Sequence, residues 1–292
     1  MILVRTVIAP LIFLLLTVSS CHRLDVKPEK AKKVKVIGHG GAGFQSPRNQ
    51  LPHNSMESGL KAVEFYGAHG VEMDVQLSKS GSFWMYHDLT LETQTQCMGC
   101  VIQKTDNQLA NCRFNNDVQV NVWNGPYALK PAAKLIHNLN LHKESPVLII
   151  DVRSTPVCSD FDRAQLINQT AEQISFIQNT YNDASKLYFI LRDKLLAEQV
   201  AGMNAQVQIL LEVPFSQTNL EFMKRNGLSG VSFHNRDLQK SQVEHLQNEG
   251  FLVCLFGAKT QSSIPQAINK SPDFLITDNI PLTLNVLKAA RD

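Results

Sequence analysis

Apolar residues follow two alternating patterns along this chain. Short runs are continuously apolar or alternate with polar residues, as in strands, and several resemble parallel strands covered on both faces. Between these runs, apolar residues recur every three or four positions, which predicts helices. The runs that predict strands are Lys35–Gly38, Val71–Leu77, Phe83–Tyr86, Val147–Val152, Leu187–Leu191, Val207–Leu211, Gly230–Phe233, Phe251–Phe256 and Phe274–Thr277. The segments that predict helices are Met56–Tyr66, Ala164–Thr180, Lys194–Met203, Leu220–Asn226, Gln239–Asn248 and Leu282–Ala290.

The order of these segments predicts the fold. Phe83–Tyr86 follows a turn-rich gap, Ser78–Ser82, so we expect it to return antiparallel to the preceding strand as a hairpin. The other eight strands, mostly separated by helices, predict an α/β fold of the (β/α)8 TIM-barrel type with this hairpin extension. An open doubly wound sheet is the alternative. The cysteine-containing stretch from Leu89 to Tyr127 predicts an irregular loop or small insertion at the active face.

The N-terminus is typical of an export signal. Arg5 precedes an apolar run, Val7–Val18, that is too short for a membrane span and ends in small residues. Val18-Ser-Ser-Cys21 resembles a bacterial lipobox, which implies that Cys21 carries a lipid. A plain secretory signal and an uncleaved anchor are the alternatives. The expected regions are a lipoprotein-type signal peptide at 1–20, a tether at 21–33 and one barrel domain at 34–292.

Export determines the expected surroundings of the protein. His22 follows Cys21 where an aspartate would favour the inner membrane, so we expect a lipoprotein on the periplasmic side of the outer membrane, or otherwise a secreted protein. The hydrophobic content of 43% is that of a globular chain, and 292 residues suit one α/β barrel. The net charge of +2, without a dense basic stripe, gives no reason to expect a nucleic-acid partner. We expect a monomer or a small homo-oligomer.

The cysteines fit an oxidising compartment. Cys97, Cys100, Cys112 and Cys158 are expected to form one or two disulfides, and four cysteines allow three connectivities. The spacing of Cys97 and Cys100 also suits a zinc site, but no second such pair or paired histidines complete one. Cys254 lies in an apolar run and is expected to be a buried free thiol.

Polar residues gather where the predicted strands end, which is where α/β barrels place their chemistry. The first strand ends at His39, and the hairpin return ends at His87. Glu72 and Asp74 lie two apart on one strand, as do Asp151 and Arg153 on another, so each pair points to one face. Later strands end at Arg192, Glu212 and His234.

These residue types together indicate a metal site. Glu72, Asp74 and Asp151 would supply hard oxygen ligands, which suit Ca²⁺ or Mg²⁺ better than zinc. Buried carboxylates are costly unless they are paired or bound to metal, so a salt bridge to Arg153 or a lysine is the alternative. Two histidines suit a general base and a general acid. Gly40 and Gly41 would let a phosphate approach the backbone closely.

Several of these motifs resemble the glycerophosphodiester phosphodiesterase family. The resemblance covers about residues 35 to 285, and Glu72-x-Asp74 followed by His87-Asp88 is its most specific part. The other motifs that carry it are His39-Gly-Gly, Asn54-Ser55, Gly70-Val, Ile150-Asp151-Val-Arg153 and Ile276-Thr-Asp278. The resemblance implies a (β/α)8 barrel that uses Ca²⁺ or Mg²⁺, with Glu72, Asp74 and Asp151 as metal ligands, and with His39 and His87 as the acid–base pair.

The resemblance also implies the reaction, the hydrolysis of glycerophosphodiesters to glycerol 3-phosphate and an alcohol. Arg153 stands where the family usually has a lysine near the phosphate, and Glu212 is expected to contact the substrate. A phospholipase C- or D-like lipid phosphodiesterase on the same fold is one alternative. A non-catalytic lipoprotein that binds a phosphorylated ligand is another.

Departures from the family motifs affect the substrate more than the reaction. Gly40 replaces the arginine of His-Arg-Gly, and His53 replaces the glutamate of Pro-Glu-Asn-Thr. Asp151 stands where a glutamate is usual. We therefore expect rebuilt phosphate recognition, with Arg153, Arg192 or Arg48 supplying the missing cation.

Overall fold

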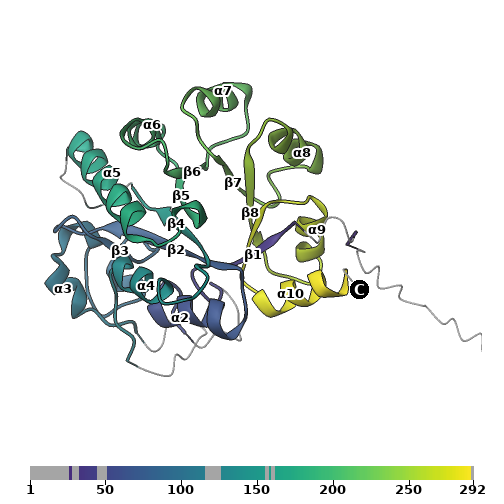
Figure 1. Cartoon of the computed structure of the whole chain (residues 1–292). Helices are drawn as coiled ribbons and strands as arrows, with labels where there is room; N and C mark the ends of the chain where they lie inside the picture. The colour runs from purple at the N-terminus through teal and green to yellow at the C-terminus, as the bar shows by residue number, and fades with distance from the viewer. Residues whose placement is uncertain are drawn as a thin grey trace, which may run out of the picture.

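Eight parallel strands close into a barrel in the computed structural model (Figure 1). The structure describes residues 26–27, 33–44, 51–115, 126–154, 158 and 162–290. The barrel closes because β1 (Lys35–Gly38) pairs in parallel with both β2 (Gly70–Leu77) and β9 (Phe274–Thr277). The remaining barrel strands are β4 (Val147–Val152), β5 (Leu187–Leu191), β6 (Gln208–Leu211), β7 (Gly230–His234) and β8 (Leu252–Ala258). The predicted TIM barrel is confirmed.

The hairpin extension is confirmed as well. β3 (Phe83–Met85) runs antiparallel to β2, with Val75 opposite Met85, and lies outside the closed ring. The turn between them includes Gly81, whose φ of 86° favours glycine. This return runs back along β2 to the level of Asp74, whose carbonyl accepts from Tyr86 N at 3.1 Å, and His87 follows Tyr86.

Helices surround the strands (Figure 1). They are α2 (Met56–Leu60), α4 (Ala132–Leu139), α5 (Arg163–Thr180), α6 (Lys194–Met203), α7 (Gln217–Arg225), α8 (Lys240–Asn248), α9 (Ser263–Asn269) and α10 (Ile280–Ala289). α2 continues as a π-helical segment, Lys61–Phe65. The sequence pattern missed α4 and α9, which are short and follow loops rather than clear capping signals.

The stretch after His87 forms a small insertion with a core of its own. It contains α3 (Asp106–Ala110) and two 3₁₀ turns, Leu91–Thr93 and Val101–Gln103. Trp84, Tyr86, Leu109 and Phe114 are among the buried residues that pack together there, separately from the barrel core. The insertion is therefore a packed unit in the residues that the structure describes.

Two disulfides join the four clustered cysteines. Cys97 pairs with Cys112 inside the insertion, and Cys100 pairs with Cys158 after β4. The structure thus selects one of the three connectivities that the sequence left open. Cys254 is a buried free thiol, as expected.

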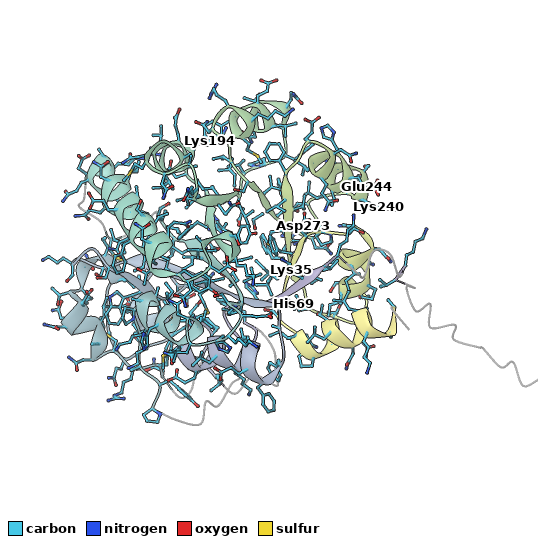
Figure 2. All side chains as sticks on the ribbon, in the orientation of Figure 1. Lys35, His69, Lys194, Lys240, Glu244 and Asp273 are labelled. Atoms are coloured by element: carbon cyan, nitrogen blue, oxygen red, sulfur yellow. A yellow bond between two sulfur atoms is a disulfide. The ribbon has the colours of Figure 1, made fainter. Side chains whose placement is uncertain are left out.

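Ion pairs lie on the exposed faces of some helices. Lys240 and Glu244, labelled in Figure 2, lie one turn apart on α8 with an N–O distance of 3.7 Å. Within the described part of the chain, no helix has the length and apolar character needed to cross a membrane. The predicted signal peptide and lipidated Cys21 lie outside the described residues.

Candidate active site

The barrel interior changes from apolar to charged along each strand. One buried cluster fills its lower part and includes Ile37, Ile149, Ile190, Leu210, Cys254 and Ile276. Residues two apart on a strand point to the same face. The residue two positions after each of these cluster members therefore also faces the barrel interior. Those next positions are His39, Asp151, Arg192, Glu212, Phe256 and Asp278. The site is therefore a charged layer on an apolar floor, at the carboxyl ends of the strands.

The strand register brings three carboxylates together at this layer. Asp74 on β2 lies directly opposite Asp151 on β4. Ligand atoms of Glu72, Asp74 and Asp151 all lie within 4.8 Å of one another, and all three residues are buried. Burial, followed by the negative charge of Asp74, raises the pKa of Glu72 to about 8. This carboxylate cluster is the arrangement that a cation would relieve.

Neighbouring groups fix the orientation of Asp74 and Glu72. The Nδ2 of Asn54 donates to Asp74 Oδ2 at 2.9 Å, and Asp74 N donates to Asn54 Oδ1 at 2.9 Å. Gly40 N donates to Glu72 Oε2 at 2.8 Å, and Gly41 N donates to the carbonyl of Glu72 at 3.1 Å. The two glycines therefore use their N–H groups to hold Glu72, and close approach of a phosphate to their backbone stays a prediction.

Two arginines lie against the same carboxylates. Arg153 Nε donates to Asp74 Oδ1 at 2.8 Å, and its Nη2 lies 3.8 Å from Asp151 Oδ2. Burial alone would raise the pKa of Asp74, but Arg153, His87 and Asn54 outweigh it and lower that pKa. Arg192 forms a bridge, donating to both oxygens of Asp151 and both oxygens of Glu212. Glu212 is thus held by Arg192, and its predicted contact with substrate stays a prediction.

Each of the two histidines is paired with an aspartate. His39 Nδ1 lies 2.7 Å from Asp278 Oδ1, and His87 Nδ1 lies 2.7 Å from Asp88 Oδ1. Burial would lower the pKa of His39, but the hydrogen bond and charge of Asp278 outweigh it and raise the pKa to about 9. Burial is likewise outweighed at Asp88, where the hydrogen bond from His87 helps lower the pKa to about 2. In both pairs, Nε2 is the ring nitrogen left for proton transfer.

An aromatic stack fills the space beside Gly40. The rings of Phe44 and His53 stack with centroids 3.7 Å apart, and Phe44 also lies 4.8 Å from the rings of His39 and His87. A Cβ at Gly40, whose φ is 52°, would approach the Phe44 ring to 2.6 Å. Burial lowers the pKa of His53 to about 4, so this ring is neutral at pH 7. The two departures from the family motifs are thus adjacent in space, with an apolar ring between them.

The carboxylate cluster fits a divalent cation by its chemistry. Its donors are carboxylate oxygens only, and Ca²⁺ and Mg²⁺ prefer such hard ligands. The raised pKa of Glu72 shows that, without a cation, three adjacent buried carboxylates cannot all ionise freely. The salt bridge with Arg153 that the sequence left as the alternative is also present, and it uses Asp74. The cation site and the ion pairs of the two arginines therefore share two carboxylates, Asp74 and Asp151.

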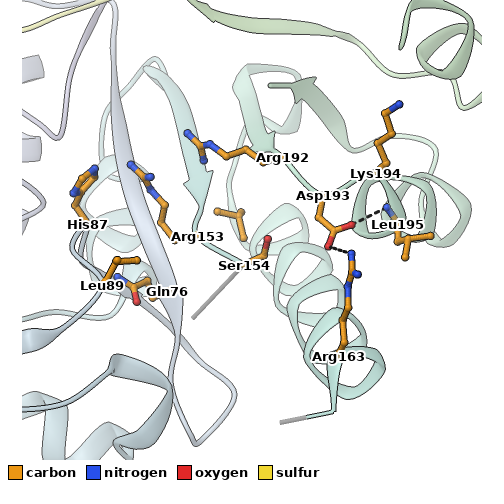
Figure 3. Close-up of a pocket in the computed structure, with 11 residues that line it drawn as sticks. Gln76, His87, Leu89, Arg153, Ser154, Arg163, Arg192, Asp193, Lys194 and Leu195 are labelled. Carbon is orange, nitrogen blue, oxygen red and sulfur yellow. Dashed lines mark hydrogen bonds and ion pairs between the residues drawn. The ribbon is translucent and has the colours of Figure 1, made fainter. Parts of the chain in front are cut away.

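A cavity of about 440 Å³ opens beside the cluster (Figure 3). His87 and Arg153 line it near the carboxylates, and Arg163 and Asp193 line it further out. Leu89 and Leu195 also line it and are 60% and 54% exposed. It is large enough for a small-molecule group.

The structure brings the predicted site residues to one mouth of the barrel. His39, Glu72, Asp74, His87, Asp151 and Arg153 converge there. Sequence reasoning gave no role to Asp88, Asp278 or Asn54, although all three lie inside the motifs that it used. Asp278 directly follows β9 and Asp88 directly follows His87, and these positions could have found both. Asn54 lies in the loop before α2 and carries no such signal. Arg48, the third predicted phosphate contact, lies outside the described residues.

Comparisons with known proteins agree with this geometry. The model of the Glycerophosphoryl diester phosphodiesterase family matches residues 39–282. Human glycerophosphodiester phosphodiesterase 1 is 30% identical over 107 residues, which are 34% of this chain and 30% of the human protein. The Bacillus subtilis protein YqiK is 39% identical over 67 residues, 23% of this chain and 25% of that protein. The chain thus matches under a third of either curated relative.

Solved structures share the fold. An Oleispira antarctica phosphodiesterase in complex with the product sn-glycerol-3-phosphate has a TM-score of 0.72 and 17% identity, covering 87% of this chain and 96% of that one. A glycerophosphodiester phosphodiesterase from Parabacteroides distasonis has a TM-score of 0.71 and 18% identity, covering 89% and 99%. At this identity the likeness shows the barrel alone.

Proposed function

The chain belongs to the glycerophosphoryl diester phosphodiesterase family, and from this premise we propose that it hydrolyses glycerophosphodiesters to glycerol 3-phosphate and an alcohol in a metal-dependent reaction. The observation that carries the proposal is the convergence of three carboxylates with two His–Asp pairs at one barrel mouth. The related phosphodiesterase that holds sn-glycerol-3-phosphate as product supports the substrate class.

The carboxylate cluster would hold the cation, which we propose to be Ca²⁺ or Mg²⁺. When bound, the cation stabilises the charge that develops on the phosphate oxygens. Asn54 and Gly40 hold two of the three carboxylates in place. Arg153 lies between Asp74 and Asp151, and we propose that it contacts the phosphate there.

The two histidines would move the protons. One of them takes a proton from the nucleophile, a substrate hydroxyl or water, and the other donates a proton to the leaving alkoxide. Asp278 and Asp88 each engage an Nδ1 atom, which fixes the ring and leaves Nε2 for the reacting oxygen. Substrate binding through the two glycines and Glu212 is part of the same proposal.

The test is the hydrolysis of glycerophosphocholine by the purified chain with Ca²⁺ or Mg²⁺. We expect release of glycerol 3-phosphate, and we expect EDTA to abolish it. In the His87→Ala variant kcat should fall by about 10²–10⁴ because one proton-transfer group is lost. His245→Ala on the outer face of α8 is the matched control and should keep full activity. Activity that persists in EDTA, or an H87A variant within a few-fold of the parent, would contradict the mechanism.

A second candidate substrate class is an intact or lysophospholipid. The observation that favours it is the pair of exposed leucines, Leu89 and Leu195, at the cavity beside the site. Apolar side chains there would accept part of an acyl chain. Comparing release from lysophosphatidylcholine with release from glycerophosphocholine decides between the two classes.

We also propose that the protein is a lipoprotein anchored through Cys21, exported to the periplasmic side of a bacterial membrane. The support is the apolar run and lipobox-like Val18-Ser-Ser-Cys21. Cell fractionation of a Cys21→Ala variant tests this. The variant should leave the membrane fraction, and unchanged membrane association would overturn the lipid anchor.

A further inference from the structure

The cavity beside the carboxylate cluster, which we call the arginine cavity, continues directly from the proposed reaction centre. His87, Arg153 and Arg192 line it and also lie beside the cluster, and from there it extends to Arg163 and Asp193 (Figure 3). A phosphodiester has two ester substituents. With its phosphorus at the cluster, one substituent would therefore enter this cavity.

The charge of the lining is one-sided. Of the described residues that line it, Arg153, Arg163, Arg192 and Lys194 are basic and Asp193 alone is a carboxylate. Two of the four cations are already occupied. Arg192 is bound by Asp151 and Glu212, and the ammonium of Lys194 lies 5.1 Å from the Phe222 ring, pointing away from Arg153 in Figure 3.

Within the described part of the chain, the other two arginines keep donors that face no acceptor. Arg153 uses Nε and Nη2 on Asp74, and Arg163 uses Nη2 on Asp193 at 2.9 Å. Among the described residues, neither arginine has a hydrogen bond from Nη1. A guanidinium presents a planar set of donors that matches phosphate or carboxylate oxygens. The cavity thus has one such group at its inner end and one at its outer end.

The same lining lacks what a cationic substituent needs. Quaternary ammonium groups are held by aromatic faces or by carboxylates. No Phe, Tyr or Trp is among the lining residues in the part of the chain that the structure describes. Asp193 is committed to Arg163 and to the N-terminus of α6, where it accepts from Leu195 N and Leu196 N.

We propose that the arginine cavity is a subsite for an ester substituent that carries its own negative charge, a phosphate or a carboxylate. The preferred substrates are then glycerophosphodiesters of anionic alcohols, with Arg163 reading the second charge. This inference rests on the proposed function, because it assumes a phosphodiester at the carboxylate cluster.

The experiment compares kcat/KM for three substrates with the Ca²⁺- or Mg²⁺-loaded chain. They are glycerophosphocholine, glycerophosphoglycerol phosphate and the glycerophosphodiester of glyceric acid. We expect an anionic substrate to be preferred over the choline ester by about 10-fold or more, as for one charge-assisted hydrogen-bonded contact. The last two substrates separate phosphate from carboxylate recognition.

The decisive variants are Arg163→Gln, which should remove the preference for anionic substrates, and Arg163→Glu, which should reverse it in favour of glycerophosphocholine. Arg236→Gln is the matched control, because Arg236 also forms an exposed pair with its aspartate, Asp237, but lies outside the cavity. Retained preference in R163Q, or an equal loss in R236Q, would overturn the subsite.

A binding readout keeps the two proposals distinguishable. Calorimetry measures the Kd of glycerophosphoglycerol phosphate for the H87A variant and for the H87A/R163Q double variant. We expect the Kd to be about 10-fold higher for the double variant. Hydrolysis of glycerophosphocholine without anionic preference overturns the subsite alone. Absence of hydrolysis of all three substrates overturns the proposed function, and unchanged binding in the H87A/R163Q variant then overturns the subsite too.

Discussion

At the scale of single residues, each buried charge in the site has a neighbour that determines its protonation. Asp278 raises the pKa of His39, and Arg153 helps lower the pKa of Asp74. At Glu72, burial and the charges of Asp74 and Asp151 outweigh His39 and the Gly40 N–H group, and the pKa rises to about 8. Because Glu72 is buried against two other carboxylates, a cation bound between them would stabilise its charge.

The first residue-scale prediction concerns Asp278, which we expect to position and charge His39. Asp278→Asn removes the negative charge 2.7 Å from Nδ1, so the raised pKa of His39 should fall toward its ordinary value of about 6.5. A raised pKa means that His39 is protonated to higher pH in the parent. The limb of the pH–rate profile due to His39 should therefore move to lower pH in D278N. An unmoved limb with a uniformly lower rate would indicate a structural role only.

Gly40 shows how one residue constrains its neighbours. Its positive φ and the 2.6 Å approach of a Cβ to the Phe44 ring both exclude an ordinary side chain. An arginine at this position cannot coexist with Phe44 as placed. The loss of the family arginine and the presence of Phe44 against His53 are therefore one coupled change.

At the scale of elements, the insertion after β3 is fastened to the barrel by polar contacts as well as by disulfides. Asp106, the first residue of α3, accepts from Ser78 Oγ at 2.6 Å, Ser82 Oγ at 2.8 Å and Trp84 Nε1 at 2.8 Å. Cys100–Cys158 joins the insertion to the segment after β4. The insertion is thus joined both to the β2–β3 hairpin and to Cys158.

The element-scale prediction is that Asp106→Asn lowers the free energy of unfolding at pH 7 by about 1–2 kcal/mol, because three donors lose a charged acceptor. Burial opposes ionisation, but these three donors outweigh it and lower the pKa of Asp106. Because the pKa of Asp106 is lower in the folded state, its charge stabilises the fold at pH values above the unfolded pKa of about 3.9. This stabilisation is lost as the pH falls through the folded-state pKa. Urea unfolding should therefore show a gap between parent and D106N at pH 7 that closes in acid.

Asp237→Asn is the control for this measurement, because Asp237 is exposed and lies 3.6 Å from its basic neighbour. It should change the free energy of unfolding by less than about 0.5 kcal/mol at either pH. A D106N variant that is as stable as D237N at pH 7 would show that Asp106 does not fasten the insertion.

At the scale of the whole molecule, the site couples cation binding to the stability of the barrel. Glu72 and Asp74 come from β2 and Asp151 from β4, so repulsion among them acts across a strand pair. A cation that binds only the folded state stabilises it by about 2.7 kcal/mol at a concentration 100 times Kd. We expect Ca²⁺ or Mg²⁺ to raise the Tm of the parent measurably.

Asp151→Asn should lose most of this cation-dependent rise, because one ligand is removed from the cluster. Glu244→Gln on α8 removes the same charge outside the site and should respond as the parent does. Thermal scans with and without EDTA measure both variants. A D151N variant that keeps the full rise would place the cation elsewhere.

The sequence by itself determined the elements and the kinds of group in the site. Most strand bounds follow directly from apolar runs, because a barrel strand is buried on both faces and its sequence shows this locally. Residues two apart, such as Glu72 and Asp74, share a face for the same local reason. The family likewise followed from motifs that are contiguous in sequence.

Only the tertiary structure decided which distant groups meet. Strand register and barrel closure place Asp278 beside His39 and Arg192 between Asp151 and Glu212, and neither contact leaves a local signal. The Cys100–Cys158 disulfide and the arginine cavity arise in the same way, from segments that are far apart in the chain. The periodicity of a segment reflects only which of its own residues are buried. Contacts between strands and loops depend instead on which strand ends the closed barrel places next to one another.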